Sequence, residues 1–403
     1  MLNVDEALKC ILENAPELKA ESVTPDDVTG RILAEDVIAQ TTQPPFAASA
    51  MDGYAVKRAD IAAGQTLTVI GEAPAGTVFS KPVLEGQAVR IFTGAAIPPG
   101  CDHVIIQENV TRAGNKITIS DGNSSASHIR AVGLDFNKGD RLIESGTQLH
   151  SLHGALVAAA NLASVKVVRK PRIVFFSNGS ELREPGQELE PGAIVNTNRY
   201  AIGALIAQWG GEGIYGGLVE DDPDQIKAIF ENNRDADVIV PIGGASVGDH
   251  DLVKPAFAAL GGTLLIEKIA IRPGKPTWFG PLPSGPPPSG PLVLGLPGNP
   301  ASSIVTASLF LQALVKKMAG HAQSTLMREK ACLVEPLAKN GARETYLRGQ
   351  TAGWDGATRL VKALPLQDSA LLHPFLNADL LICRKSNCEA AITGDEVEVV
   401  LLR

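Results

Sequence analysis

The sequence predicts a multidomain protein of the α/β plus β class, centred on a three-layer α/β domain with a mostly parallel sheet. Strand-like apolar runs alternate with helix-like segments between residues 171 and 320, the pattern of such a domain. Short β-type runs without helical periodicity fill the stretches before and after it, which predicts an inserted β-rich domain and a C-terminal β barrel. The length, 403 residues, is too great for one core.

An elongated N-terminal domain is expected to be interrupted by the β-rich domain. A helix-like pattern opens the chain, and a second one returns at Leu149–Ala163, followed by a strand-like run at Val165–Val168. Between them the chain is rich in Gly and Pro. The expected domains are 1–42 with 141–170 (elongated N-terminal), 43–140 (inserted β-rich), 171–322 (α/β) and 323–403 (C-terminal barrel).

The expected elements of the α/β domain follow from apolar runs and helix-ending residues. Its strands are expected at Arg172–Phe176, Gly213–Val219, Ala236–Ile242, Thr263–Ile271 and Pro291–Leu296, and its helices at Asn198–Trp209, Pro223–Asn232, Asp251–Leu260 and Asn299–Met318. Asp222 is a suitable N-cap for the second helix, and Gly210 and Gly211 would end the first. Barrel strands are expected at Arg328–Glu335, Glu344–Gly349, Arg359–Leu364, Leu380–Arg384 and Glu396–Leu402.

Composition excludes several classes of function. The net charge is −8, which argues against a general nucleic-acid or anionic-membrane surface. The five cysteines show no CxxC pair, so reduced thiols are expected rather than a zinc or iron–sulfur site. The N-terminus lacks a signal-peptide pattern, and no apolar run reaches transmembrane length. We therefore expect a cytoplasmic protein.

Gly-rich and acidic loops follow four of the expected parallel strands. They are Ser177-Asn-Gly-Ser-Glu181, Glu220-Asp-Asp222, Gly243-Gly-Ala-Ser-Val-Gly-Asp-His-Asp251 and Pro297-Gly-Asn-Pro300. Ligands of open α/β sheets bind outside the carboxyl ends of the strands. Loop amides before a helix can hold a phosphate, and glycines allow close approach. The alternative, an ordinary strand-to-helix turn, stays open for the third loop.

The acidic residues of these loops each have two interpretations. Asp251, five residues after Ser246, could hold Mg²⁺ against a phosphate. Asp222 is better explained as a helix cap, whereas Asp221 is preferred as a ligand to a metal or water. Glu181 either contacts a polar ring edge or lies exposed on its loop.

Positive charge is concentrated in one segment of this acidic chain, Lys268-Ile-Ala-Ile-Arg-Pro-Gly-Lys-Pro276. If residues 268–271 are extended, Lys268 and Arg272 share one face of the strand. Pro273 and Gly274 would then form a turn that presents Lys275. Three cations in eight residues suit an oxyanion or phosphate site; a solvated basic edge is the alternative.

Five motifs together resemble the molybdopterin molybdenumtransferase family, which includes MoeA and the E domain of gephyrin. They are Pro44-Pro-Phe-Ala-Ala-Ser-Ala-Met-Asp-Gly-Tyr-Ala-Val56, Ile91-Phe-Thr-Gly-Ala-Ala-Ile-Pro-Pro-Gly100, Gly243-Gly-Ala-Ser-Val-Gly248, Arg272-Pro-Gly-Lys-Pro276 and Leu296-Pro-Gly-Asn-Pro300. They occur in the family's order and span nearly the whole chain.

The resemblance implies a fold, a reaction and partners. It implies four domains, the third like that of molybdopterin adenylyltransferases, and a homodimer with an active site shared between subunits. It also implies that adenylylated molybdopterin and molybdate give molybdenum cofactor and AMP, with Mg²⁺ or another divalent cation. A molybdopterin adenylyltransferase is a further expected partner.

The resemblance also assigns roles to individual residues. The expected catalytic residues are Asp52, Glu181, Asp221, Asp251, Lys268 and Lys275, of which Asp221 and Asp251 would hold the metal. The expected ligand-binding residues are Thr93, Gly243, Gly244, Ser246, Gly248, Arg272, Pro297, Gly298, Asn299, Ser302, Arg348 and Ser369. Arg272, Lys275, Ser302, Arg348 and Ser369 would hold molybdate. Two residues depart from the family pattern, Ser180 where many members have Asp and Arg272 where many have Lys.

Two other functions remain as alternatives. A molybdopterin adenylyltransferase would share the third domain, but the additional domains favour the insertion step. A non-catalytic dimeric scaffold would use the same fold to display a binding groove, and the acidic and basic site residues argue against a purely structural role.

Overall fold

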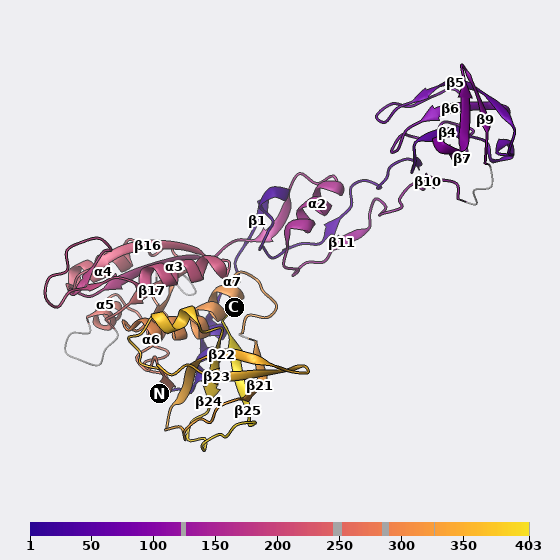
Figure 1. Cartoon of the computed structure of the whole chain (residues 1–403). Helices are drawn as coiled ribbons and strands as arrows, with labels where there is room; N and C mark the ends of the chain where they lie inside the picture. Colours follow the sequence, from indigo (N-terminus) through magenta and orange to yellow (C-terminus); the bar gives the residue numbers. More distant parts are fainter. Residues whose placement is uncertain (122–125, 245–251, 284–289, 326, 403) are drawn as a thin grey trace. The chain divides into compact units, whose positions relative to one another are not determined.

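The structure, a computed structural model, describes residues 1–121, 126–244, 252–283, 290–325 and 327–402 (Figure 1). The chain divides into two compact units. The large unit comprises 1–21, 30–32 and 167–403, and the small unit comprises 22–29 and 33–166. No helix in the described ranges is long and apolar enough to cross a membrane.

The large unit contains the expected α/β domain. Its five-stranded sheet has the order β16-β13-β17-β20-β19, and all neighbours are parallel except the edge strand β19. The strands are β13 (Arg172–Asn178), β16 (Glu212–Val219), β17 (Val238–Ile242), β19 (Trp278–Pro281) and β20 (Leu292–Gly295), and the two short strands β14 (Leu182–Arg183) and β15 (Ile194–Val195) pair separately. The prediction of a mostly parallel sheet is confirmed.

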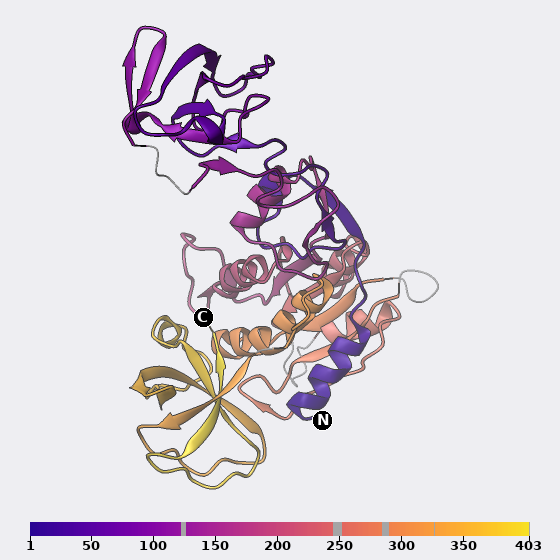
Figure 2. The same cartoon turned by 90° about the vertical axis from the view of Figure 1, so that its right-hand side faces the viewer.

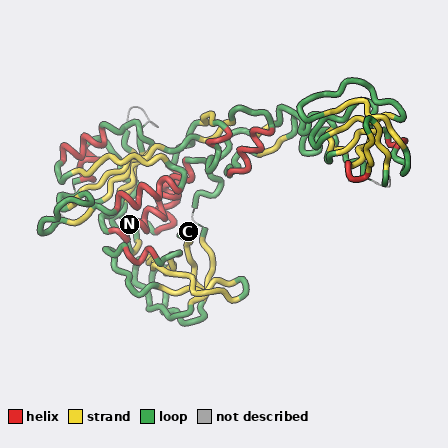
Figure 3. The backbone as a smooth tube through the Cα atoms, turned by 45° about the horizontal axis from the view of Figure 1, so that its top comes forward, coloured by secondary structure: helices red, strands yellow, loops and turns green. Residues whose placement is uncertain are grey.

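Helices cover both faces of this sheet (Figure 3). They are α3 (Asn198–Gln208), α4 (Pro223–Glu231), α5 (Val253–Ala259), α6 (Pro300–Thr306) and α7 (Gln312–Met318). Alternate β13 residues enter opposite cores: Ile173 packs with α3 and α7, and Val174 packs with α4 and α5. Asp222 caps α4 as predicted, because its carboxylate accepts from two backbone N–H groups of the first turn.

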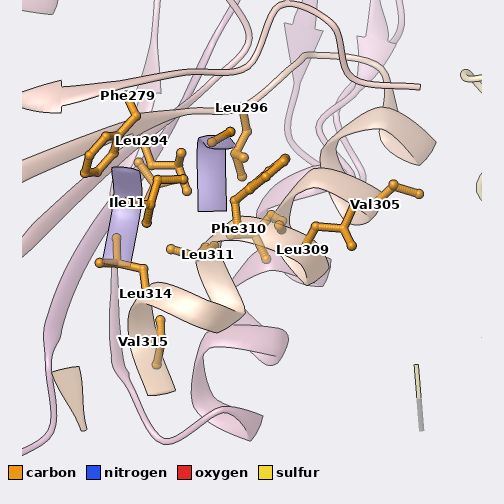
Figure 4. Packing of buried hydrophobic residues seen from close by; sticks show 14 of the residues in the cluster. Ile11, Phe279, Leu294, Leu296, Val305, Leu309, Phe310, Leu311, Leu314 and Val315 are labelled. Carbon is orange, nitrogen blue, oxygen red and sulfur yellow. The ribbon is translucent and has the colours of Figure 1, made fainter. Parts of the chain in front are cut away.

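One long helical segment follows the Pro297–Pro300 loop. A π-helical stretch, Ala307–Leu311, joins α6 to α7, so helix continues through the predicted range Asn299–Met318. Buried side chains of this segment meet the sheet and the N-terminal helix α1 (Val4–Asn14), as Figure 4 shows for Phe310, Leu314 and Ile11. A capping box formed by Asn3 and Glu6 begins α1. Because α1 packs here, it belongs to the large unit, whereas residues 22–29 and 33–42 of the predicted segment 1–42 belong to the small unit.

The C-terminal part of the large unit is a closed five-stranded barrel, which is seen at the end of the chain in Figure 2. Its strands are β21 (Arg328–Leu333), β22 (Glu344–Asp355), β23 (Thr358–Ala363), β24 (Leu380–Arg384) and β25 (Glu396–Leu401), and the β22–β24 pairing closes it. The predicted strands are confirmed within a few residues, except that β22 runs longer. The short strand β18 (Ile271–Arg272) pairs with β22 and so brings the basic segment to the barrel.

The small unit contains the expected β-rich structure. Its six-stranded sheet has the order β7-β4-β6-β5-β9-β8. These strands are β4 (Gly53–Val56), β5 (Thr66–Ala73), β6 (Gln87–Ile91), β7 (His103–Ile106), β8 (Val110–Ala113) and β9 (Lys116–Ile119). The remaining elements here are β2 (Val37–Ile38), β3 (Ala48–Ser49), β10 (Ile129–Arg130), β11 (Arg141–Ile143) and α2 (Ser151–Ala159); β1 (Ala20–Val23) and β12 (Val165–Val168) pair where the chain passes from one unit to the other.

One predicted strand is largely wrong. Over Thr263–Ile271, the structure has an isolated bridge between Ile266 and Phe279 and only the last residue in β18. The segment bonds to β19 at a few points, among them the Ile266 N–H to the Phe279 carbonyl at 3.0 Å. Apolar residues in this stretch therefore pack against a sheet edge without forming a regular ladder.

Candidate active site

A polar cavity of about 660 Å³ lies at the carboxyl ends of β13, β17 and β20. It is lined by residues of the predicted loops, including Glu181, Gly243, Gly244, Pro297, Gly298 and Asn299. The parallel order of these strands brings their carboxyl ends to one edge, as the sequence predicted. We call this the polar cavity.

Two glycines allow β13 and β17 to end close together. A Cβ on Gly243 would lie 2.3 Å from the Asn178 carbonyl oxygen, and one on Gly244 would lie 2.5 Å from Asn178 Oδ1. Both glycines have positive φ, +95° and +58°, which is strained for side-chain-bearing residues. Glycine is thus required here by the backbone itself.

The acidic loop residues take different positions. Glu181 lines the polar cavity. Asp221 is not among the lining residues of the cavity; its Oδ2 accepts from the backbone N and the Oγ of Ser180, at 3.2 and 3.1 Å. Ser180, which departs from the family pattern, therefore connects the loop after β13 to the loop after β16. The loop after β13 also contains Glu181, which lines the cavity.

A second cavity, of about 470 Å³, is strongly cationic. Its lining includes Arg272, Lys275, Lys339, Arg343 and Arg384, and Asp368 is the one carboxylate among its described lining residues. We call this the basic cavity. Such an excess of positive charge suits a tetrahedral oxyanion or a phosphate.

Strand pairing between the basic segment and the barrel creates this concentration of charge. Arg272 lies opposite Thr345 in the β18–β22 pair, and Thr345 lies opposite Arg384 in the β22–β24 pair. Residues directly opposite each other project to the same face of a sheet. The chain then turns toward Lys275 at Gly274, which has φ +109° and packs closely against Thr306 of α6.

The two cavities adjoin, because Pro276 and Ser302 line both of them. Ser369 lines the basic cavity and joins its barrel loop to the Pro297–Pro300 loop. The Ser369 carbonyl accepts from the Ala301 N–H at 3.0 Å, and Asn299 Nδ2 donates to Ser369 Oγ at 3.2 Å. The structure thus brings Arg272, Lys275, Ser302 and Ser369 together, as expected.

Arg348 is placed differently from the expectation of direct oxyanion binding. It is 2% exposed and does not line the basic cavity. Its Nη1 donates to the Leu371 carbonyl, and its Nη2 donates to the Leu366 and Asp368 carbonyls, at 2.9–3.1 Å. Since these donors are already satisfied, Arg348 positions the loop that carries Ser369.

Lys268 also lies outside both cavities. Its ammonium group pairs with Glu267 at 3.6 Å. The expected shared face with Arg272 is not formed, because residues 268–270 are not in a strand. Three of the expected site residues, Ser246, Gly248 and Asp251, lie outside the described residues. Asp251 was the leading candidate for metal binding.

Asp52 and Thr93 form a pair within the small unit. The backbone N and the Oγ1 of Thr93 both donate to Asp52 Oδ1 at 2.8 Å, and these bonds hold the pKa of Asp52 below its ordinary value. Gly53 begins β4 rather than completing a turn, and a Cβ there would lie 2.0 Å from the Ile105 carbonyl oxygen. The motif therefore fixes an ionised carboxylate beside a tightly paired strand.

Comparisons with known proteins agree with this architecture. Family profiles match residues 2–161 (MoeA N-terminal region, domain I and II), 178–317 (probable molybdopterin binding domain) and 330–402 (MoeA C-terminal region, domain IV). A molybdopterin molybdenumtransferase of Haemophilus influenzae is 38% identical over 403 residues, which cover 99% of this chain and 98% of that protein. The chain belongs to the MoeA family.

Further relatives are similar to large parts or the whole of this MoeA-family chain. A molybdopterin molybdenumtransferase of Nostoc sp. is 38% identical over 341 residues, 83% of this chain and 78% of that protein. Crystal structures titled molybdopterin biosynthesis MoeA protein from Pyrococcus horikoshii cover 100% of this chain and 99% or 100% of theirs, with TM-scores of 0.82 and 0.76 at 31% and 29% identity. The chain is an enzyme of the molybdopterin molybdenumtransferase type and works in molybdenum cofactor biosynthesis.

Sequence reasoning missed several cavity residues of this MoeA-family site. Lys339, Arg343 and Arg384 line the basic cavity, and Asn178 and Asn198 line the polar cavity. Lys339 and Arg343 flank an Asn-Gly pair, a turn-forming sequence that marks a basic loop. Arg384 had no local indication, because only the register of β22 and β24 places it beside Thr345.

Proposed function

We propose that this chain inserts molybdenum into adenylylated molybdopterin. Molybdate and the adenylylated pterin are the substrates, and molybdenum cofactor and AMP are the products. The dithiolene of the pterin takes up the metal while the adenylyl group is cleaved. The whole-chain similarity to molybdopterin molybdenumtransferases supports this reaction.

The adjoining cavities are the observation that carries the proposal. An oxyanion in the basic cavity would be held by Arg272 and Lys275 with hydroxyl donors from Ser302 and Ser369. The pterin end of the substrate would occupy the polar cavity, where Glu181 lies. Because Ser302 lines both cavities, an oxyanion and a pterin could meet at their common border.

A divalent cation such as Mg²⁺ is part of the proposal. Mg²⁺ is commonly held by one or two carboxylates together with water and substrate phosphates. Among the described residues, Glu181 lines the polar cavity and Asp221 lies one hydrogen bond from the same loop, so the residues fit such an ion. When bound, Mg²⁺ would neutralise charge on the adenylate phosphates.

The proposed assembly is a homodimer in the cytoplasm with a site shared between subunits. Asp52, held ionised by Thr93, would contact the pterin or help position the dithiolene. A molybdopterin adenylyltransferase would supply the adenylylated substrate. The net charge of −8 favours local rather than general anion binding.

Release of AMP tests this function. Purified chain is incubated with adenylylated molybdopterin and Mg²⁺, with and without molybdate, and AMP is quantified by chromatography. We expect molybdate-dependent release that is lost in Lys275→Ala and Asp251→Ala, each checked for folding by circular dichroism, and kept in Lys330→Ala, which changes an exposed barrel lysine. Adenylate formation from ATP and unmodified molybdopterin would instead favour the adenylyltransferase, and an intact substrate under all conditions would favour the scaffold.

A further inference from the structure

A buried arginine of the barrel lines the basic cavity without a carboxylate partner. Arg384, in β24, is only 7% exposed. Its Nη2 donates to the backbone carbonyls of Ala338 and Glu389, which carry no net charge. In the described part of the chain its guanidinium forms no ion pair, and the carboxylate of Glu389 pairs with Lys339 at 2.6 Å instead. Because buried charges in proteins are nearly always paired, this cation indicates a missing anion.

One nitrogen of the Arg384 guanidinium remains available to a ligand. Nε is fully buried and unpaired, so a ligand does not touch it. Nη1 donates to no described residue and is not one of the fully buried unpaired atoms, so it keeps accessible surface. The equally buried Arg348 differs, because its Nε, Nη1 and Nη2 all donate within the barrel. An anion in the cavity would therefore accept from Nη1 of Arg384.

Asn340 fixes two further cations beside Arg384. Its Nδ2 donates to the carbonyls of Arg343 and Arg384 at 2.9 and 2.8 Å. Its Oδ1 accepts from Thr345 Oγ1 at 2.8 Å. These bonds hold the loop that carries Lys339 and Arg343 against the end of β24. The positions of the three cations are therefore set by the fold before any ligand binds.

These cations lie at one end of the basic cavity, which we call the barrel end. It consists of Lys339, Arg343 and Arg384, none of which lines the polar cavity. Arg272 and Arg384 lie on either side of Thr345 in three neighbouring strands. At the usual strand spacing, their Cα atoms are about 10 Å apart. The barrel end is thus displaced from the border with the polar cavity, where the proposed function places an oxyanion.

The charge of the basic cavity exceeds what one oxyanion neutralises. Five cations and one carboxylate are among its described lining residues, an excess of four positive charges. The pairing of Lys339 with Glu389 reduces this excess to three. Molybdate carries two negative charges, so one such ion leaves positive charge beside a buried guanidinium. The cavity volume of about 470 Å³ is many times the roughly 30 Å³ that a water molecule occupies, so two small ions fit.

We propose that the barrel end of the basic cavity is a second anion position, which binds a tetrahedral dianion through Arg384, Arg343 and Lys339. This inference rests on the proposed function, which uses only the other end of the cavity. The proposed reaction offers two sources of such an ion, a second molybdate or the phosphate group of AMP. Both are tetrahedral and doubly charged, and charge-assisted hydrogen bonds from guanidinium groups suit either.

Counting bound anions tests the inference without pterin or turnover. The full-length chain is titrated by calorimetry with sodium molybdate, sodium phosphate and AMP, each alone. Molybdate is then titrated into chain saturated with phosphate or AMP, at fixed ionic strength and slightly alkaline pH. We expect two bound anions per chain, either two molybdates or one molybdate together with one phosphate or AMP.

Variants assign the second anion to the barrel end. Arg384→Gln should weaken the second anion about ten-fold or more, the loss expected for a hydrogen bond to a charged group, and should leave the first in place. Arg343→Gln should act in the same direction, and it decides if circular dichroism shows that Arg384→Gln does not fold. Lys275→Met should weaken the first anion instead. Arg112→Gln is the matched control, since Arg112 also donates to a backbone carbonyl but lies exposed in the small unit.

The results identify the ion and separate this inference from the proposed reaction. A second molybdate that depends on Arg384 supports the inference with free oxyanion as the source, and phosphate or AMP bound beside one molybdate supports it with the adenylate as the source. One anion per chain in every titration overturns it, as does a second anion that both barrel-end variants retain. AMP release by a chain that binds one anion overturns this inference alone. An Arg384-dependent second anion without molybdate-dependent AMP release overturns the proposed reaction alone.

Discussion

Replacement of Gly274 by alanine tests how the basic cavity is built. Gly274 connects Arg272 to Lys275 with φ +109°, and an added Cβ would lie 2.2 Å from Cγ2 of Thr306. Thr306 is fully buried in α6. Gly274→Ala therefore combines backbone strain with a collision against a side chain that has no room to move.

The two effects have separate magnitudes. A residue held in a sparsely populated φ/ψ region costs about 1–3 kcal/mol, and overpacking a buried site typically costs about 1–3 kcal/mol. The sum is roughly 2–6 kcal/mol, a large part of ordinary domain stability. Any relief by movement of the turn would displace Lys275 from the basic cavity and weaken oxyanion binding.

A second substitution separates the collision from the strain. Thr306→Ser removes Cγ2 but keeps the hydroxyl, which donates to the Ser302 carbonyl at 2.8 Å. We expect Gly274→Ala/Thr306→Ser to recover the overpacking part, about 1–3 kcal/mol. Urea unfolding followed by circular dichroism measures stability, and calorimetry measures molybdate affinity. Gly192→Ala is the control for strain alone, because Gly192 has φ +93° with open space around it.

Two results would refute this reasoning. An unchanged unfolding midpoint for Gly274→Ala would mean that the turn relaxes without cost. A double variant no more stable than Gly274→Ala would mean that Thr306 is not the obstacle. Recovery of stability without recovery of molybdate affinity would show that the altered turn still misplaces Lys275.

Three further outcomes are expected. Lys275→Met should weaken molybdate binding about ten-fold or more, since hydrogen bonds to charged groups contribute about 1.5–3 kcal/mol. Lys268→Met should change molybdate affinity little, because Lys268 lies outside the cavities. Equal losses of affinity in calorimetry would contradict this prediction. Thr93→Val should raise the pKa of Asp52 by removing one of its two donors, so the carboxylate should protonate at higher pH in an NMR titration, and an unmoved titration would count against the pairing. Burial lowers the pKa of His103 below 6.5, so the unfolded chain binds the proton more readily and the stability of the fold should fall as pH drops below 6.5. His103→Gln should therefore reduce the difference between the urea unfolding midpoints at pH 7.5 and 5.5. An undiminished difference would contradict this prediction.

The sequence by itself determined the local elements. The N-cap at Asp222, the five barrel strands, and the strand and helix patterns from 171 to 320 are present, with the exception of the strand expected at Thr263–Ile271. These features depend on near neighbours in the chain, through side-chain periodicity and hydrogen bonds within one turn. The loops at the sheet edge were predictable too, because parallel strands place their carboxyl ends together.

Only the tertiary structure decided which charged and polar groups share a cavity. Arg272 meets Arg384 across Thr345 through pairings between segments about 70 and 40 residues apart in the chain. Arg348 turns its guanidinium to carbonyls of its own barrel loop, and Lys268 lies outside the cavities. Helix α1 likewise joins the large unit through packing with α7. Register and packing between distant segments depend on every buried surface at once, so no local pattern contains them.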